Sequence, residues 1–388
     1  MTQGQTTYDL VVIGAGIMGA ATAYFAARAG LSVVVIERGS IASGTSSRCE
    51  GNILVSDKER GPELELALYS RQVWREDLAE HADDWEYQDK GGMIVAETDA
   101  SMQNLLALVE HQRALGIDAD VLHGERELHA LEPYLAPDLV GGAFYPGDAQ
   151  VQPILATHHL LRLARDAGAE LRTHTPVLAI ETGRGRVTGV RTPDGVIGAE
   201  AVINCGGAWS ADVAALAGVE LPVLPRRGFV LVTEPVPITI HHKVYSAGYV
   251  GDVASSDPSL QVSPVVEGTP SGTILLGASR ERVGFDESFS IEAVSRIARA
   301  GVSLFPALAD LKLLRAYSGF RPYCPDHLPV IGPDARLPGL WHSAGQEGAG
   351  IGLSVGVAKV LAQALVGAQT DLDLTPFRPE RFEGDAAA

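Results

Sequence analysis

The sequence predicts an α/β protein that is built around a buried parallel sheet and contains more than one domain. Residues 8–13 form a β-branched apolar run, which is followed by a glycine-rich turn, an alanine-rich stretch over residues 17–29, and a second apolar run over residues 31–36. Strands of a parallel sheet are buried on both faces and read as continuous apolar runs, so this order predicts strand, helix and strand. The length of 388 residues allows about two or three domains.

Helices and a strand meander are predicted in the middle of the chain. Helical patterns cover residues 62–81, a short stretch around residues 125–131, and residues 153–168. Strand patterns follow at residues 177–180, 187–191 and 201–204. Asp194-Gly195 is a strong hairpin-turn signal, so we expect the second and third of these strands to be joined by a hairpin.

The last third of the chain mixes strands with two long helices. Strand-like runs at residues 227–234 and 273–276 lie in a region rich in proline and glycine. Helices are predicted over residues 291–305 and 352–365, and a glycine-rich turn at residues 345–350 precedes the second one.

Composition and charge exclude several classes of protein. A hydrophobic fraction of 46% with 20% charged residues is typical of a packed globular protein. The 30 Lys and Arg against 48 Asp and Glu give a net charge of −18, which argues against a general binder of nucleic acid or anionic membranes. No apolar run reaches the ~18 residues that a transmembrane helix needs, and the N-terminus does not resemble a signal peptide. We therefore expect a cytoplasmic protein without a transmembrane segment.

The cysteines and histidines predict neither a metal site nor a disulfide framework. Cys49, Cys205 and Cys324 lie far apart and form no C-x-x-C pair. The histidine pairs at residues 158–159 and 241–242 lack a convincing ligand spacing. We therefore expect no bound metal.

The clearest motif is the run Gly-Ala-Gly-Ile-Met-Gly at residues 14–19, which joins the first strand to the first helix. Gly14 permits a tight turn, Gly16 lets the backbone approach a pyrophosphate at the helix N-terminus, and Gly19 allows close packing of helix on sheet. Glu37 ends the second strand eighteen residues after Gly19, where it can accept hydrogen bonds from ribose hydroxyls. This order predicts a dinucleotide-binding site but does not by itself distinguish NAD from FAD.

Three further segments favour FAD. The loop at residues 41–53 is rich in small polar residues and glycine, so it can line a long cofactor with hydroxyls and backbone N–H groups. Residues 204–209 place glycines directly after a strand. Residues 345–350 precede a helix whose N-terminal dipole can stabilise negative charge on a reduced ring system. The last segment argues against a nicotinamide-dependent dehydrogenase.

Three motifs in this order resemble the superfamily of FAD-dependent oxidoreductases that includes D-amino-acid oxidase, glycine oxidase and sarcosine oxidase. They are VVIGAGIMG, VINCGGAWS, and SGFRPYCPDHLPVIGP followed by AGQEGAGIGLS. The resemblance covers nearly the whole chain. Within the superfamily, the sequence is most similar to catalytic subunits of opine oxidase, hydrogen cyanide synthase and D-hydroxyproline dehydrogenase type.

The resemblance implies bound FAD and the residues that hold it. These are Gly14, Ala15, Gly16, Ile17, Met18, Gly19, Glu37, Arg38, Ser46, Ser47, Arg48, Gly51, Asn52, Val177, Gly206, Gly207, Trp209, Gly345, Gln346, Glu347, Gly348, Gly350 and Ile351. The resemblance implies that Val177 contacts the adenine side through its backbone and that residues 345–350 face the pyrimidine edge of the flavin. Covalent attachment of the flavin through Cys324 stays open, although an unmodified thiol is favoured.

Arg321 is the expected substrate residue. It lies in the run Gly-Phe-Arg-Pro, which resembles the family motif whose arginine grips the substrate carboxylate, and a guanidinium can bind both carboxylate oxygens at once. The alternative is a structural arginine that pairs with an acid. Many relatives add a tyrosine at the carboxylate; here Gln261 lies nearest that place, and Tyr249, from an apparent insertion at residues 245–257, is the other candidate.

The resemblance also implies a two-domain architecture. A Rossmann-like FAD-binding domain of the glutathione-reductase type is expected from residues 1–85, 145–220 and 316–388. A second α+β domain, which carries a mostly antiparallel sheet and binds the substrate, is expected from residues 86–144 and 221–315.

The implied reaction is oxidation of the C–N bond of an amino acid or N-substituted amino acid, by hydride transfer to flavin N5. The imine product then hydrolyses to an oxo acid. Candidate substrates are an opine, a D-amino acid, a proline derivative, sarcosine or glycine. The subfamily resemblance favours a catalytic subunit of a dehydrogenase complex, whose partner subunits carry an iron–sulfur centre or a further flavin. A self-sufficient oxidase that converts O2 to H2O2 and a non-catalytic flavin-bearing interaction subunit remain as alternatives.

Overall fold

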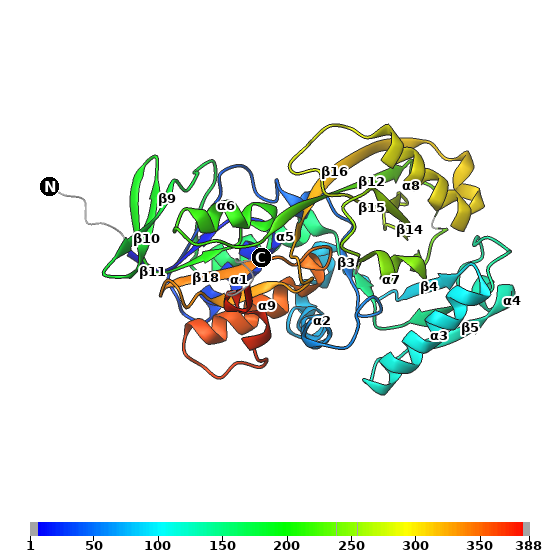
Figure 1. The fold of residues 1–388 in the computed structure, drawn as a ribbon, viewed down its shortest axis with the longest axis horizontal. Helices are drawn as coiled ribbons and strands as arrows, with labels where there is room; N and C mark the ends of the chain where they lie inside the picture. Colours follow the sequence, from blue (N-terminus) through cyan, green and yellow to red (C-terminus); the bar gives the residue numbers. More distant parts are fainter. Residues whose placement is uncertain (1–6, 238, 254, 383–388) are drawn as a thin grey trace.

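The computed structural model describes residues 7–237, 239–253 and 255–382. These residues form two lobes, each built around an eight-stranded sheet, which lie side by side in Figure 1. The chain passes between the lobes repeatedly, so each sheet takes strands from distant parts of the sequence.

The first lobe contains the predicted parallel sheet. Six of its eight strands lie in the order β17 (Val330–Pro333), β18 (Leu340–Ala344), β11 (Gly195–Asn204), β1 (Thr7–Ile13), β2 (Val33–Ile36) and β8 (Glu170–Arg172). The other two, β9 (Ala179–Gly183) and β10 (Arg186–Thr192), join the sheet through the pairing of β10 with β11. Neighbours from β18 to β8 pair parallel, and β17 pairs antiparallel with β18 at the edge. All four residues of β2 are buried, as expected of a strand that is covered on both faces. The α/β prediction is confirmed.

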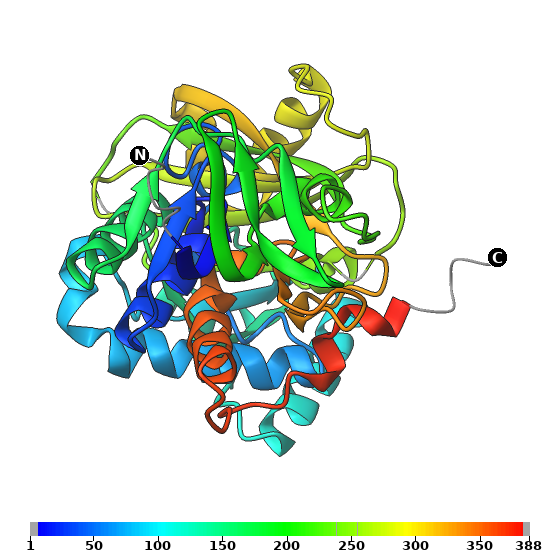
Figure 2. The ribbon, with the colours of Figure 1, turned by 90° about the vertical axis from the view of Figure 1, so that its left-hand side faces the viewer.

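The two faces of β1 pack on different layers. Leu10 and Val12 lie in the core formed with helices α1 (Ile17–Arg28), α5 (Pro153–Asp166) and α9 (Gly350–Leu365). Val11 and Ile13 lie in the core formed with β9 (Ala179–Gly183), β10 (Arg186–Thr192) and the region of α6 (Ser210–Ala215). Figure 2 views this lobe from its end, with β9, β10 and β11 in green in front. Thr192 pairs with Gly195 across the turn, which confirms the predicted hairpin.

Helix α2 (Pro62–Gln72) is shorter than the helix predicted over residues 62–81. The chain continues as a π-helical turn (Val73–Asp77) and a 3-10 turn (Ala79–Trp85). The buried rings of Trp74 and Trp85 pack edge to face here, with centroids 5.5 Å apart. Long-range packing of this kind bends the chain away from the α-helix that the local pattern predicts.

The second lobe carries the mostly antiparallel sheet that was predicted. Its strand order is β16 (Leu313–Tyr323), β12 (Leu224–Thr233), β15 (Ile274–Arg280), β14 (Gln261–Gly268), β13 (Lys243–Ser246), β4 (Gly92–Ala96), β6 (Gly141–Tyr145) and β5 (Asp120–His123). Strands β13 and β4 pair parallel and the other neighbours antiparallel. Helix α8 (Ile291–Leu304) packs on β12, β14 and β15, and α3 (Asp99–Ala114) and α4 (Gly124–Leu131) pack near β4 to β6. Short strands β3 (Asn52–Ile53) and β7 (Ala149–Gln150) form a separate pair.

The predicted domain boundaries remain a prediction, and two features of the second lobe bear on them. Position 316 falls inside β16, which pairs with β12 along its length. The segment 245–257, expected as an insertion, begins inside β13, which pairs with both β4 and β14, and continues into α7 (Gly248–Val253). The start of this segment is therefore an integral part of the sheet.

Candidate active site

A cavity of about 400 Å³ lies where the carboxyl ends of β1 and β2 face the sheet of the second lobe. Its lining runs from Glu37 and Val177 in the first lobe to Arg321 on β16, and it includes the turn before α9. Ligands of open α/β sheets bind at the carboxyl ends of the strands, so this is the expected place for a bound cofactor.

The turn between β1 and α1 has no room for side chains. Gly14 has a φ of +109°, and a Cβ on it would lie 2.5 Å from the backbone oxygen of Cys205. A Cβ on Gly19 would lie 1.9 Å from the backbone oxygen of Gly14. Gly16 precedes α1 and lines the cavity. The glycines thus leave the backbone at the start of α1 open to a ligand, as a pyrophosphate site requires.

Glu37 is fixed by backbone groups at the end of β2. Its Oε2 accepts a hydrogen bond from the N–H of Ala15 (2.9 Å), and its Oε1 accepts one from the N–H of Gly39 (2.7 Å). A carboxylate has about four acceptor positions, so both oxygens keep capacity for ribose hydroxyls.

A strap from the second lobe covers the Trp209 side of the cavity. Phe285, in the segment between β15 and α8, stacks on Trp209 with ring centroids 5.1 Å apart and an interplanar angle of 9°. The guanidinium of Arg38 lies 4.4 Å from the centre of the same indole ring. Both Arg38 and Trp209 line the cavity, so the strap holds this end of the cavity together.

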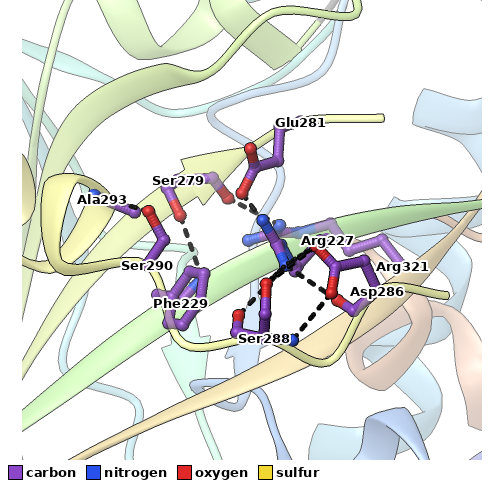
Figure 3. Close-up of polar contacts among 9 residues, drawn as sticks. All are labelled: Arg227, Phe229, Ser279, Glu281, Asp286, Ser288, Ser290, Ala293 and Arg321. Atoms are coloured by element: carbon purple, nitrogen blue, oxygen red, sulfur yellow. Dashed lines mark hydrogen bonds and ion pairs between the residues drawn. The ribbon is translucent and has the colours of Figure 1, made fainter. Parts of the chain in front are cut away.

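Arg321 lines the same cavity and lies beside the turn before α9. Its Nη1 donates a hydrogen bond to the backbone oxygen of Ser279 (2.8 Å), and Figure 3 shows the two residues side by side. A Cβ on Gly348 would lie 3.7 Å from Arg321 Nε, so the guanidinium directly adjoins the turn. The contact to Ser279 uses one of the five N–H donors, and the others remain able to bind a carboxylate.

Two glycines make room beside Arg321 and Arg48. Gly228 on β12 and Gly319 on β16 are opposite each other in the sheet, and both line the cavity. A Cβ on Gly228 would lie 2.1 Å from Arg321 Nη1, and a Cβ on Gly319 would lie 2.7 Å from Arg48 Cβ. A flat group can therefore approach this part of the sheet closely.

Most of the predicted site residues come together in this cavity. Those that line it are Gly14, Gly16, Ile17, Met18, Glu37, Arg38, Ser46, Arg48, Gly51, Asn52, Val177, Gly206, Gly207, Trp209, Tyr249, Arg321, Gln346, Glu347, Gly348, Gly350 and Ile351. Ala15, Gly19, Ser47, Gly345 and Gln261 do not belong to the lining. Ala15 and Gly19 contribute to the turn itself, since the N–H of Ala15 binds Glu37 and Gly19 packs against the backbone of Gly14. Gln261 Oε1 accepts a hydrogen bond from Arg226.

The sequence reasoning missed the part of the lining that β12 and β16 provide. Residues 227–234 were predicted as a strand, but Gly228 was not assigned to the site. A glycine inside a strand often marks a place where a ligand comes close to the backbone, so its position was the available signal. Arg226, two residues before Gly228, faces the same side of β12 and was missed with it.

Burial raises the pKa of two thiols near the site. Burial raises the pKa of Cys49, which lines the cavity, to about 12, and the nearby Glu50 adds to the effect. Burial likewise raises the pKa of Cys324 to about 12. Cys324 is absent from the cavity lining, and its Sγ lies 3.0 Å from the position of a Cβ on Gly345, behind the turn.

Metal and membrane features are absent from the described part of the chain. In residues 7–237, 239–253 and 255–382, no group of three or more His, Cys, Asp or Glu side chains could hold a metal ion. No helix among these residues has both the length and the apolar character that crossing a bilayer requires.

Known proteins match this chain over nearly its whole length. A family profile described as FAD dependent oxidoreductase matches residues 9–364. The chain is 30% identical to the glycine oxidase of Geobacillus kaustophilus, across 97% of this chain and 98% of that protein. It is 28% identical to the hydrogen cyanide synthase subunit HcnC of Pseudomonas aeruginosa, across 98% of each. The crystal structure of the G. kaustophilus glycine oxidase superimposes with a TM-score of 0.88 at 26% identity, covering 97% of this chain and 99% of that one.

The residues of the cavity fit the cofactor that the family description names. Glycines clear the backbone at the start of α1, and Glu37 stands at the end of β2. Gln346 Nε2 and Glu50 Oε1 are buried in the lining without a hydrogen-bond partner among the described residues, so a polar ligand is needed to satisfy them. The cofactor is FAD, and the chain belongs to the family of FAD dependent oxidoreductases.

Proposed function

We propose that this protein oxidises the C–N bond of an amino acid or an N-substituted amino acid. The observation that carries the proposal is the position of Arg321, which lines the cavity with its guanidinium beside the turn before α9. A guanidinium there can hold a substrate carboxylate in a fixed orientation. The glycine oxidase relative, which is named for an amino acid, supports the same substrate class.

The chemistry divides between the cofactor and the chain. When bound, FAD would supply the hydride acceptor that oxidation of the substrate C–N bond to an imine requires. Arg321 binds the carboxylate and thereby fixes the Cα, which is the main contribution that positioning can make. The substrate amine reacts in its neutral form, so no strong protein base is required. Water then adds to the released imine and gives an oxo acid and an amine or ammonia.

The same cavity residues can be assigned roles on this proposal. Glu37, Arg38 and Val177 hold the adenosine half, residues 14–19 with Ser46 and Arg48 hold the pyrophosphate, and residues 346–351 hold the flavin pyrimidine edge. All these segments line one continuous cavity. We assign Gly228 to the flavin end because it lies against Arg321, and Gly319 to the same end because it lies opposite Gly228 in the sheet.

We further propose that the electrons leave the flavin toward a partner subunit. The relative HcnC is itself named as a subunit, and the similarity to it extends over 98% of both chains. The alternative is a self-sufficient oxidase, which the similarity to glycine oxidase favours. Reoxidation of the substrate-reduced flavin distinguishes the two. Fast reaction with an artificial dye and slow reaction with air support the partner subunit, whereas fast reaction with air and stoichiometric H2O2 support the oxidase.

An anaerobic screen of the FAD-loaded protein tests the reaction itself. Amino acids of both configurations, sarcosine, proline derivatives and opines are added separately, and loss of the visible flavin absorbance is recorded. We expect at least one carboxylate-bearing amine to bleach the flavin and to yield an oxo acid. If dithionite bleaches the flavin and no amine does, the protein is a flavin-bearing interaction subunit, and the proposal is wrong.

A further inference from the structure

Arg321 has a second arginine directly opposite it. Arg226 on β12 pairs in register with Arg321 on β16. Directly opposed residues of antiparallel strands point to the same face, with Cβ atoms about 4.5–5.5 Å apart, and like charges in this arrangement repel each other. Two arginines opposed on one face of the sheet therefore indicate that an anion belongs between or beside them.

Both arginines face a second cavity that adjoins the first one. It measures about 330 Å³, and its lining includes Arg226 and Arg280. Arg321, Tyr249, Gln346, Glu347 and Gly348 line both cavities. A substrate whose carboxylate lies at Arg321 therefore has room to extend away from the cofactor, past Arg226.

The hydrogen bonds of Arg226 are incomplete. The residue is 2% exposed, and its Nη2 donates to the backbone oxygen of Ser255 (2.8 Å) and to Gln261 Oε1 (3.2 Å). Its Nη1 lies 3.6 Å from Glu347 Oε2. Its buried Nε has no hydrogen-bond partner among the described residues. A donor left without an acceptor in a buried site costs about 1–3 kcal/mol, so the site is arranged for an acceptor that a ligand brings.

The surroundings of Arg226 are positive. Burial lowers the pKa of Arg226 to about 10, and the charges of Arg280 and Arg321 act in the same direction, against the opposing charge of Glu347.

Three other acids of the second cavity have ion-pair partners of their own. Asp57 and Glu63 lie 3.4 Å and 3.2 Å from Lys58 Nζ, and Asp326 lies 2.6 Å from Arg381 Nε. Glu347 is therefore the acid of this group that the structure pairs with Arg226. A second negative charge on the ligand would be well placed here.

We propose that the substrate carries two carboxylates, one held by Arg321 and the other by Arg226. The proposal rests on the proposed function and names its substrate class, an amine with two carboxylates. An N-(carboxyalkyl) amino acid and an acidic amino acid share this chemistry, and the experiment below tells them apart.

Two dead-end ligands test the second carboxylate without any turnover. Thiodiacetate carries two carboxylates and (methylthio)acetate carries one, and both have sulfur in place of the amine, so neither has a C–N bond to oxidise. Their dissociation constants are read from the change that they cause in the flavin spectrum of the FAD-loaded protein. We expect thiodiacetate to bind roughly 10- to 100-fold more tightly, as for a charged hydrogen-bonded pair. Equal binding, or tighter binding of (methylthio)acetate, would overturn the proposal.

Substitutions then locate the effect. In Arg226→Gln the preference for thiodiacetate should disappear while (methylthio)acetate binds as before, and Arg226→Lys should keep part of the preference because the charge is retained. Arg282→Gln is the matched control, since Arg282 donates to the backbone oxygen of Ser256 (2.7 Å) and lines neither cavity. A preserved preference in Arg226→Gln would reject Arg226 as the second site. If Arg226→Gln does not fold, the ligand preferences of the wild-type protein and of Arg226→Lys still test whether Arg226 binds the second carboxylate.

Substrate pairs identify the source of the second carboxylate. Faster anaerobic bleaching by iminodiacetate than by sarcosine supports an N-(carboxyalkyl) amino acid, and faster bleaching by aspartate or glutamate than by alanine supports an acidic amino acid. Faster bleaching by the monocarboxylate of each pair overturns the proposal. No bleaching by any amine, together with tighter binding of thiodiacetate, would refute the proposed oxidation but support the two-carboxylate site, so the two failures are distinguishable.

Discussion

Arg226 and Arg227 are neighbours in the sequence, but they lie on opposite faces of β12 and have opposite surroundings. Figure 3 shows Arg227 among Glu281, Asp286 and Ser288. Its Nε donates to Glu281 (2.9 Å), and its Nη1 lies within reach of Asp286 and Ser288. Arg226 instead faces a cavity, with one acid at 3.6 Å and a buried Nε that has no described partner.

The difference separates a structural arginine from one that is suited to a ligand. The chain itself provides hydrogen-bond acceptors for Nε and Nη1 of Arg227, which ties the Phe285 strap to β12 through Asp286 and Ser288. Arg226 keeps a buried Nε without a described partner, and both Arg226 and its cross-strand partner Arg321 line the second cavity. Burial alone does not distinguish the two neighbours, since Arg226 is 2% exposed and Arg227 is 4% exposed. The hydrogen bonds of the two guanidinium groups do distinguish them. In Arg227 both Nε and Nη1 donate to the chain, whereas in Arg226 only Nη2 donates to a described residue.

The largest effect is expected from Arg321→Ala, which removes the donor that we assign to the substrate carboxylate. The value of kcat/KM should fall by roughly 30- to 1000-fold, because a charge-assisted pair in a desolvated site is lost. The flavin spectrum should stay largely unchanged. Arg321→Lys should recover only part of the activity, since the bidentate fork is gone. Steady-state kinetics with the best amine of the screen provide the measurement, and near-normal kcat/KM in Arg321→Ala would reject the assignment.

Arg227→Gln should act on stability and leave ligand preference intact. It leaves Glu281, a mostly buried acid, without its partner and should lower the free energy of unfolding by about 2–3 kcal/mol. Urea unfolding of the FAD-loaded protein measures the loss of stability. Arg282→Gln is the control, because it also removes a positive charge but Arg282 forms no ion pair among the described residues. A loss of thiodiacetate preference in Arg227→Gln without a loss of stability would reverse the roles that we give to the two arginines.

Gly228→Ala should weaken substrate binding by displacing Arg321. The new Cβ would lie 2.1 Å from Arg321 Nη1 and 2.5 Å from the backbone oxygen of Ser279, so the hydrogen bond between them must shift. We expect binding of (methylthio)acetate to weaken by roughly tenfold, as for the loss of about one good hydrogen bond. Gly251→Ala is a suitable control, because no atom of the described residues outside its own helix and its chain neighbours lies within 4 Å of its Cβ position. Unchanged binding in Gly228→Ala would show that Arg321 does not need its present position.

Phe285→Ala should give the smallest effect, on cofactor binding. Loss of the stacking on Trp209 costs about 0.5–1.5 kcal/mol, so FAD should dissociate a few-fold more readily. Fluorescence of released FAD during dilution measures the dissociation constant. Phe289→Ala serves as the control, since Phe289 is 60% exposed and its ring packs on Phe229 instead of Trp209. Equal FAD affinity in the two variants would show that the strap does not contribute to cofactor binding.

The parts of the molecule that follow from short-range patterns could be predicted from the sequence. The first turn, the acid at the end of β2 and the turn before α9 are each encoded in a few adjacent residues, and they all reach one cavity. The hairpin at residues 194–195 is a local signal of the same kind. These features needed no knowledge of which distant strands pair.

The features that depend on pairing between distant strands could not be predicted. Arg226 faces Arg321 only because β12 and β16 pair in one register, which no local pattern fixes. The placement of Gln261 behind Arg226 instead of in the cavity has the same origin. The early end of α2 likewise depends on packing between Trp74 and Trp85.

A crystal structure of the FAD-loaded protein with (methylthio)acetate bound tests the central claim most directly. The account predicts that the ligand carboxylate lies within hydrogen-bond distance, about 2.7–3.2 Å, of the Arg321 guanidinium, beside the turn at residues 346–350. Thiodiacetate in the same crystals should place its second carboxylate at Arg226. A carboxylate bound away from Arg321, with that side chain still donating only to Ser279, would contradict the account.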